Sequence, residues 1–204
     1  MLASITPLGE RSRRSRWGVT VSALILGATG GGAALGLAFG TLGSVTIARL
    51  DLTALATAVA FAAVVGVGIA VDRGVFAISI PTFKRQVAKE WMTEFRGWVY
   101  GLGFGIQLGV GFATIVTSAA TYTAFAAAFL AQTPARGAAI GGVYGLIRGA
   151  VNLAAWRINS PEQLLRFHHA LEQQGAAVAR PTVIVEAGAI AIAVVGTVVI
   201  GGIG

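Results

Sequence analysis

The chain contains no cysteine, and this absence removes several functional classes at once. Without thiols there are no disulfide bonds, no thiolate metal ligands and no dithiol redox relay. Histidine is almost as scarce: His168 and His169 are adjacent, so on a helix they point in different directions and form a poor ligand pair. We therefore predict no metal site and no cofactor, and we place both histidines at a membrane interface.

Charged residues are also scarce. They form 11% of the 204 residues, while 55% are hydrophobic; soluble domains carry about 25% charged residues. A soluble domain of this size would leave too much apolar surface in water, so we expect the lipid bilayer to surround the chain. The net charge of +7 would otherwise suggest nucleic acid. Here the basic residues lie between apolar runs, where they set membrane topology, and we expect no nucleic-acid partner.

Proline is rare and glycine abundant, with 5 and 29 residues. Glycine, alanine, serine and threonine fill the apolar runs, which suits helices packed closely in lipid. Runs near or above the length of about 20 residues that a spanning helix needs occur at 18–48, 52–71, 98–131, 138–156 and 182–203. The sequence thus predicts an all-α, polytopic membrane bundle that forms a single membrane domain.

Basic residues alternate between rich and poor connecting segments. Residues 1–17, 72–97 and 157–181 are rich in arginine and lysine, whereas the other two connections hold only Arg49 and Arg136. The positive-inside rule places the rich segments in the cytoplasm. We expect five spans in a bacterial inner membrane, with a basic cytoplasmic N-terminus and the C-terminus outside. A cleaved signal peptide is the alternative for the first run, but its apolar stretch of about 30 residues exceeds the core of about 7–15 in such peptides.

The third run is too long for a simple span. At 1.5 Å per residue it would extend about 50 Å across a core of about 30 Å. Two spans there would move the basic segment 157–181 outside, so we predict one long helix, tilted or broken. Its glycines are the expected place of a break; they are Gly101, Gly103, Gly105, Gly109 and Gly111. A re-entrant segment buried in protein is the alternative.

Two cytoplasmic segments resemble each other. "AISIPTFKRQVAKEW" begins at Ala77 and "RINSPEQLLRFHHAL" at Arg157, and in each a proline opens a stretch of helical periodicity. We predict amphipathic segments at about 77–95 and 160–175 and an internal repeat of about 80 residues. The second segment has Leu164, Leu165, Phe167 and Leu171 on its apolar side and would lie along the headgroups.

Four polar residues fall inside predicted spans: Gln107, Arg148, Asn152 and Glu186. A charge in the membrane costs a few kcal/mol and normally faces a partner or a wet cavity. One hypothesis is that the four residues line or gate a path for a solute or ion. The other is a structural salt bridge between Arg148 and Glu186 that locks the fourth span to the fifth, with Glu186 alternatively at the interface.

A row of hydroxyl groups follows one face of the third run. Thr114, Thr117, Ser118 and Thr121 have i, i+3, i+4, i+7 spacing. Such a row can line a polar path, or it can pack against another helix with each hydroxyl bonded to its own backbone carbonyl. We favour packing.

Several glycine pairs are spaced four residues apart, in the pattern of closely packed membrane helices. They are Gly27–Gly31, Gly32–Gly36–Gly40 and Gly101–Gly105–Gly109. They do not follow a strand and no lysine accompanies them, so they do not predict a phosphate-binding loop. No nucleophile, base and acid occur in a catalytic pattern, and we expect no enzyme.

Residues 96–172 resemble a family of small bacterial membrane proteins related to the cytochrome c biogenesis and disulfide-interchange transmembrane domains. The likeness lies in the order of "RGWVYGLGFGIQLGVGFATIVTSAATYTAFAAAFL", a short loop, "GGVYGLIRGAVNLAAW" and "SPEQLLRFHHAL". The resemblance implies pseudo-repeated helices and passage of reducing equivalents, solutes or metals across the membrane. The thiol members need paired cysteines, which this chain lacks, so no functional residue can be carried over.

Together these features predict a transporter-like membrane protein that passes an ion or a small solute. Five spans enclose little space, so a homo-oligomer would suit this function. The alternative is a non-transporting membrane subunit or assembly factor that packs its small-residue faces against a partner membrane protein.

Overall fold

A computed structural model of the chain describes residues 5–47, 54–73, 94–111 and 119–173. Every regular element in these ranges is helical, which confirms the all-α class. The elements are α1 (Pro7–Ser12), α2 (Trp17–Thr46), α3 (Ala54–Asp72), α5 (Gly97–Val110), α6 (Ala120–Leu130), α7 (Pro134–Ala150), the 3-10 helix η2 (Val151–Arg157) and α8 (Pro161–Gln173).

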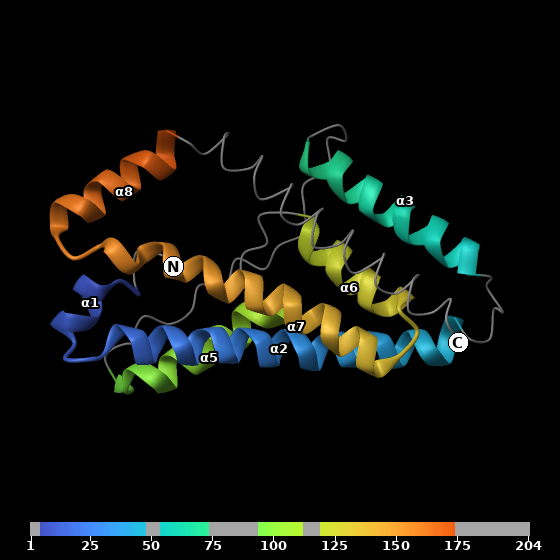
Figure 1. The fold of residues 1–204 in the computed structure, drawn as a ribbon, viewed down its shortest axis with the longest axis horizontal. Coiled ribbons are helices and arrows are strands. Elements are labelled where there is room, and N and C mark those ends of the chain that lie inside the picture. Colours follow the sequence, from blue (N-terminus) through green and yellow to red (C-terminus); the bar gives the residue numbers. More distant parts are fainter. Residues whose placement is uncertain (1–4, 48–53, 74–93, 112–118, 174–204) are drawn as a thin grey trace.

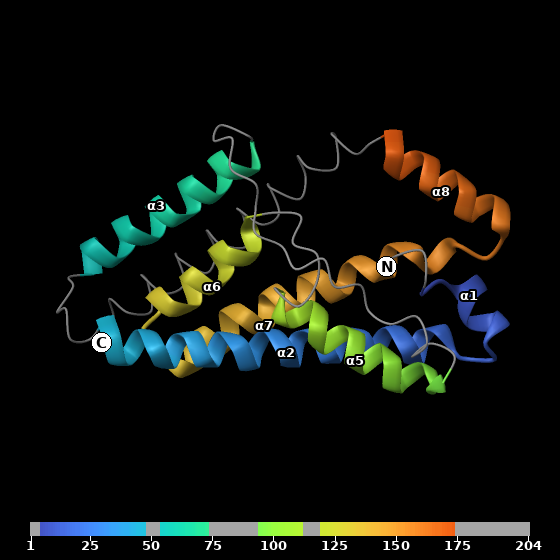
Figure 2. The same ribbon diagram turned by 180° about the vertical axis from the view of Figure 1, so that it is seen from behind.

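Helix α2 is the centre of the bundle (Figures 1 and 2). Its 30 residues contact α7 along one side and α5 along another. Helix α5 runs parallel to it, because Gly101 lies at Thr20 and Gly109 lies at Ala28. Helix α7 runs antiparallel, since Gly137 lies at Gly36 while Gly145 lies at Ala28.

The three helices touch through glycine, as the four-residue spacing predicts. Positions on all three helices leave no room for a side chain, because a Cβ atom would overlap the backbone of the neighbouring helix. These positions are Gly27, Gly31, Gly32, Gly36, Gly40 and Gly43 on α2, Gly101, Gly105 and Gly109 on α5, and Gly137, Gly141 and Gly145 on α7. Close packing is therefore confirmed for the predicted glycine pairs. The matching row on α7 was not among the predictions.

The long third run is divided into two helices. Helix α5 follows the first half of α2, and α6 continues in the same direction towards its end, where Phe129 meets Gly43 (Figure 2). The run is thus broken, one of the two forms predicted. The predicted place was only partly right: α5 is continuous through Gly101, Gly105 and Gly109, whose missing side chains serve contact with α2, and it ends beside Gly111.

Helix α6 lies over α2 and α7, and α3 lies on the outer side of α6 (Figure 1). Gly68 of α3 sits against the side chain of Thr123, which allows this contact. The opposite side of α3 is open: Val59 and Val67 are more than half exposed, and a Cβ at Gly66 would meet nothing within 4 Å.

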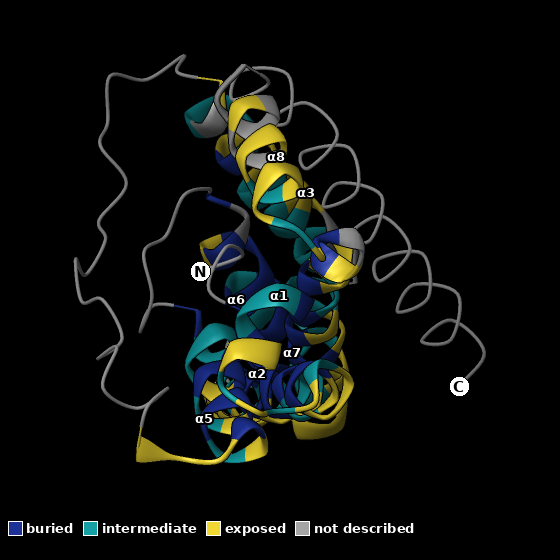
Figure 3. Cartoon of the chain, turned by 90° about the vertical axis from the view of Figure 1, so that its left-hand side faces the viewer, coloured by how far each residue is buried: buried dark blue, intermediate teal, exposed yellow. Residues whose placement is uncertain are grey.

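One end of the bundle collects the basic helix ends. The starts of α2 and α5 and the end of α7 meet there, and α1 covers them together with η2 (Figure 3). The amide of Leu8 donates a hydrogen bond to the carbonyl of Ile158 across this contact. Residues 1–17 were predicted as a basic cytoplasmic N-terminus, and their side of the membrane stays a prediction. Those that the structure describes are folded onto the bundle, where α1 buries the side chain of Glu10.

Helix α8 confirms a helix at the second predicted amphipathic segment. It stands apart from the bundle near the same end, with mostly exposed residues (Figures 1 and 3). Leu165 on its surface is 59% exposed. The first predicted segment, 77–95, lies outside the described residues except for Glu94 and Phe95.

Two helices in the described ranges are long and apolar enough to cross a membrane, Trp17–Thr46 and Pro134–Trp156. Shorter apolar helices occur at Val59–Val71 and Thr121–Leu130. By length and composition alone these helices suggest a membrane protein. The fifth predicted span, 182–203, lies outside the described residues.

The predicted internal repeat finds no support in the described helices. It would pair unbroken α2 with the broken α5 and α6. It would also match Gly31, inside a helix and buried against Ile106, with Gly111, which ends a helix at a φ of 76°. The two halves therefore use corresponding positions differently.

Candidate functional site

The break between α5 and α6 lies against α7 in the middle of the bundle. Gly111 ends α5 in a left-handed conformation, with φ 76°. A Cβ at this position would come within 2.8 Å of the Thr121 side chain and 2.9 Å of the Tyr144 hydroxyl. Only glycine suits such a conformation and such a close approach. The end of α5 and the start of α6 therefore meet at Tyr144 of α7.

Arg148 is linked to this break through Tyr144. The Arg148 guanidinium Nη1 donates a hydrogen bond of 2.6 Å to the Tyr144 hydroxyl, and that hydroxyl donates one of 2.9 Å to Oγ1 of Thr121. The guanidinium carbon also lies 5.5 Å from the centre of the Tyr144 ring, a cation–π distance. We name Arg148, Tyr144 and Thr121 the break cluster.

The break cluster carries a positive charge without an acidic partner among the described residues. The sequence holds no aspartate or glutamate between Glu94 and Glu162. Within the described ranges the ion pair is between Arg13 and Glu10, at the basic end. A guanidinium has five N–H donors, and the described contacts of Arg148 use one of them for a hydrogen bond. The remaining donors suit an anionic group.

Apolar rings form one wall of the break cluster. The Phe125 ring of α6 packs edge-on against Tyr144 at 5.3 Å and stacks with Phe39 of α2 at 5.5 Å. Such a wall lowers the local dielectric, so a charge–charge contact at Arg148 is worth more than it would be in water. The cluster therefore combines one cation, two hydroxyls and an apolar side.

The structure brings together two of the predicted site residues, Arg148 and Thr121, through Tyr144. Asn152 does not join them: it is buried, and its amide donates to the carbonyl of Gly149. It was predicted one α-helical turn from Arg148 on the same face, but the α-helix ends at Ala150 and Asn152 lies in the 3-10 helix η2.

Gln107 is half-buried on α5 and makes no hydrogen bond to the break cluster among the described residues. The other predicted residues lie outside the described ranges. They are Thr114, Thr117 and Ser118 of the hydroxyl row and Glu186 of the fifth run. The pairing of Arg148 with Glu186 and the direction of the hydroxyl row therefore stay predictions.

Tyr144 was not among the predicted site residues, although the sequence holds a signal for it. Tyr144 and Arg148 are four residues apart, and residues at this spacing are neighbours on a helix. Thr133 and Pro134 also mark the start of α7: the Thr133 hydroxyl accepts a hydrogen bond from the amide of Arg136. Tyr144 and Arg148 therefore lie in one continuous helix, and their four-residue spacing places them on the same side of it.

A second polar cluster lies at the basic end around Glu10. The Glu10 side chain is fully buried. The Tyr100 hydroxyl lies 2.5 Å from both carboxylate oxygens, the Thr20 hydroxyl donates to Oε2 at 2.9 Å, and Arg13 pairs with Oε1 at 3.0 Å. We name these four residues the Glu10 cluster. It ties α1 to the starts of α2 and α5.

The Glu10 cluster was not predicted either. Its signal was weak: Glu10 is the only acidic residue in the first 50 and lies next to a row of arginines. The local start of α1 is readable, because Thr6 caps it with a 3.1 Å hydrogen bond from the Gly9 amide and Pro7 follows. Burial of the carboxylate depends on Tyr100, 90 positions away.

Metal-binding side chains do not gather in the part of the chain that the structure describes: no three histidine, cysteine, aspartate or glutamate residues lie together there. His169 is exposed on α8. The break cluster, with a guanidinium and two hydroxyls, is a poor metal site because its strongest group is a cation. Its chemistry is suited to holding an anion.

Comparisons of the chain with protein-family models, with curated proteins and with solved structures found no match. The resemblance of residues 96–172 to the cytochrome c biogenesis and disulfide-interchange domains therefore stays a prediction.

Proposed function

We propose that the chain is a multi-pass protein of a bacterial inner membrane that passes a small solute or ion, with the break cluster as its polar site. The proposed topology has five spans, with α5 and α6 together as the third, the N-terminus inside and the C-terminus outside. The observation that carries the proposal is a half-buried arginine at a helix break, without an acidic partner among the described residues.

An arginine beside a helix break is costly inside a membrane. A charge inside a membrane is unfavourable by a few kcal/mol or more and is kept where it serves a pathway or a partner. A broken helix leaves backbone groups without intrahelical partners, and this is tolerated in a membrane only inside protein or beside water. In transporters, discontinuous helices form substrate sites near the membrane centre. Both features meet at Tyr144.

Transport is tested with the purified protein in proteoliposomes. Uptake of small anions, small cations and neutral solutes would be measured for the wild type, for Arg148→Gln and for Arg136→Gln. Arg136 is an exposed residue in the first turn of α7 and serves as the matched control. We expect uptake that Arg148→Gln abolishes and Arg136→Gln preserves. Equal uptake by all three proteins, or none above empty vesicles, would reject the proposal.

Topology has its own test, because the chain is free of cysteine and offers no background labelling. Single substitutions Ser12→Cys and Gln132→Cys lie at opposite ends of the bundle. In intact cells an impermeant thiol reagent should label the second and not the first. Labelling of Thr117→Cys would further show that the hydroxyl row faces water rather than a helix.

The alternative function, a non-transporting membrane subunit or assembly factor, is favoured by the open side of α3. The glycine faces of α2, α5 and α7 are occupied by one another, whereas Val59, Gly66 and Val67 of α3 face outward. A partner protein, or a second copy, would pack there. The test is purification of the protein in mild detergent. A partner that co-purifies in stoichiometric amount with the wild type but not with Gly66→Leu would support this function over autonomous transport.

A further inference from the structure

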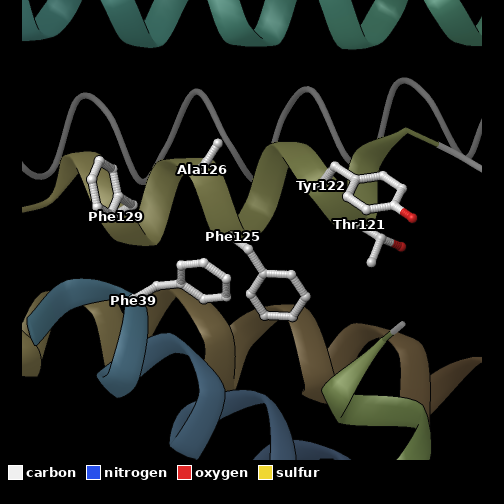
Figure 4. A pocket seen from close by; sticks show the side chains of 6 residues that line it. All are labelled: Phe39, Thr121, Tyr122, Phe125, Ala126 and Phe129. Carbon is white, nitrogen blue, oxygen red and sulfur yellow. The ribbon is translucent and has the colours of Figure 1, made fainter. Parts of the chain in front are cut away.

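The pocket on α6 and the surface at the start of α2 and α5 are both apolar, and they differ in charge. The rings of Phe39, Phe125 and Phe129 line the pocket, and its described lining holds no charged residue (Figure 4). The surface at the start of α2 and α5 has exposed arginines directly beside it. This second surface therefore combines an apolar face with positive charge.

Exposed arginines meet where α2 and α5 begin. A Cβ at Gly97 would come within 3.1 Å of the Ser15 hydroxyl, so the start of α5 touches the chain just before α2. Arg14 and Arg16 flank Ser15, and Arg96 precedes Gly97. All three arginines are exposed. We name Arg14, Arg16 and Arg96 the arginine patch.

The Glu10 cluster holds the arginine patch in place. The Glu10 carbonyl accepts hydrogen bonds from the amides of Arg13, at 3.1 Å, and Ser15, at 2.9 Å, which closes the turn between α1 and α2. The buried Glu10 carboxylate pairs with Arg13, and no arginine of the patch forms an ion pair within the described residues. Even with the nearby Glu94 counted, the exposed side chains here carry a net positive charge, which attracts an anionic surface.

An apolar surface begins beside the arginine patch and follows α5. Trp98, Leu102 and Ile106 are exposed and four residues apart, so they form one outer row of the helix. The row borders α2, because a Cβ at Gly27 would overlap the Leu102 carbonyl and one at Gly31 would overlap the Ile106 carbonyl.

Helix α2 extends this apolar surface. Val19 and Leu26 are two turns apart on one face, with 50% and 69% of their surface exposed, and Leu26 directly precedes Gly27, where α2 touches α5. A Cβ at Gly30 on the same face would meet nothing within 4 Å. Both helices run in parallel away from the arginine patch (Figure 2), so the surface is charged at its start and apolar along its length.

We propose that this surface binds an anionic phospholipid of the cytoplasmic leaflet, with its phosphate at the arginine patch and an acyl chain along Trp98, Leu102 and Ile106. The inference rests on the membrane placement in the proposed function and not on transport. Guanidinium groups match phosphate oxygens through paired hydrogen bonds. Tryptophan favours the level between headgroups and acyl chains, and Trp98 lies between the patch and the rest of the row.

The test uses the full chain in mild detergent and two added lipids with the same acyl chains, phosphatidylglycerol and phosphatidylcholine. Both contain a phosphate, but phosphatidylcholine has no net charge. Binding would be measured by native mass spectrometry. An arginine near an anionic surface contributes about fivefold in affinity. We expect the wild type to prefer phosphatidylglycerol, and the triple variant Arg14→Gln, Arg16→Gln, Arg96→Gln to lose at least about tenfold in affinity for it.

A matched control removes exposed arginines outside the patch, with Arg73→Gln, Arg136→Gln and Arg166→Gln in one protein. It has the same net charge as the patch variant, so it separates a local site from attraction by the whole protein. We expect the control to bind phosphatidylglycerol as the wild type does.

The position of the acyl chain has a separate readout. Bromine atoms on an acyl chain quench tryptophan fluorescence on contact. Brominated phosphatidylglycerol should quench the wild type more than brominated phosphatidylcholine does, and both Trp98→Phe and the patch variant should remove this difference. If the patch variant does not fold, the two lipids compared on the wild type and on Trp98→Phe still decide.

Equal binding of the two lipids by the wild type would overturn the inference, and so would an equal loss of affinity in the patch variant and the control. Displacement of phosphatidylglycerol by glycerol 3-phosphate would assign the patch to a soluble phosphate and reject the lipid. Failure of the proposed function looks different: patch-dependent lipid binding without Arg148-dependent uptake rejects transport and leaves the lipid site. Arg148-dependent uptake without patch-dependent lipid binding rejects the lipid site alone.

Discussion

Glu10 and Arg148 are both charged residues inside the bundle, but Glu10 is paired with a residue of opposite charge and Arg148 has no such partner among the described residues. Glu10 is fully buried and receives contacts from Tyr100, Thr20 and Arg13. Arg148 is half-buried and its described hydrogen bond is to one neutral hydroxyl. A satisfied charge locks segments together, whereas an incompletely satisfied one keeps the capacity to bind. We therefore expect a structural role for Glu10 and, under the proposed function, a binding role for Arg148.

Removal of the satisfied charge should have the largest effect on stability. Glu10→Ala would leave the Tyr100 and Thr20 hydroxyls buried without their acceptor. Breaking a buried charged pair destabilises a protein by about 3–5 kcal/mol. We therefore expect the free energy of unfolding to fall by about 3 kcal/mol, measured by denaturant titration of the protein in detergent. The control is Glu162→Ala, an exposed position on α8 that should change stability by less than about 0.5 kcal/mol. Wild-type stability for Glu10→Ala would remove the contrast between the clusters.

Substitution of a glycine on α2 should have the next largest effect on stability, because the glycine contacts join the helices that carry both clusters. Gly32→Ala would place a methyl group against the backbone of Gly141, and overpacking of this kind costs about 1–3 kcal/mol. Gly30→Ala lies two residues away on the same helix, with nothing within 4 Å, and should be neutral or stabilise by up to about 1 kcal/mol. Thermal unfolding of the two variants gives the comparison. Equal shifts would contradict close packing at Gly32.

The Tyr144 hydroxyl, which connects Arg148 to Thr121 in the break cluster, should contribute less to stability. Tyr144→Phe removes the hydroxyl between Arg148 and Thr121, and a hydrogen bond of this kind contributes about 1 kcal/mol. Thr121→Val removes the other side of the same bond. The double variant should then cost less than the sum of the single ones, measured by the same titration. Strict additivity would show that the two hydroxyls do not interact.

Removal of the unsatisfied charge should have the smallest effect on stability. Arg148→Gln loses one hydrogen bond but also relieves the cost of a charge among apolar groups, so we expect a change within about 1 kcal/mol. Loss of uptake with retained stability would be the signature of a binding residue. If Arg148→Gln destabilises as strongly as Glu10→Ala, Arg148 has a buried acidic partner, and Glu186→Gln should show the same loss.

Much of the fold was predictable from local patterns. The bounds of α2, α3, α7 and α8 lie within a few residues of the predicted runs, because apolar length and caps act over short stretches of chain. The glycine spacing also predicted close packing correctly. The exact place of the break was not predictable, since Gly101, Gly105, Gly109 and Gly111 look alike in sequence. Only contact with α2 distinguishes the first three from the last.

The candidate site was predictable in part. Arg148 stands out as a charge in an apolar run, and Thr121 belongs to a regular hydroxyl row. Tyr144 forms its hydrogen bond with a residue of another helix, Thr121, and Asn152 lies in the 3-10 helix η2 with its amide bonded to the Gly149 carbonyl. Polar residues are easy to find in a membrane sequence, but their partners depend on which helices meet.

The sequence by itself determined the helical class, the apolar runs, the concentration of basic residues at one end and the glycine faces. These follow from composition and from the periodicity of a helix, which are local properties. Tertiary structure decided that α5 and α6 form one broken path along α2, that Tyr144 joins Arg148 to Thr121, and that Glu10 is buried. Each of these depends on segments that are distant in the chain, such as Glu10 and Tyr100, coming within hydrogen-bonding distance.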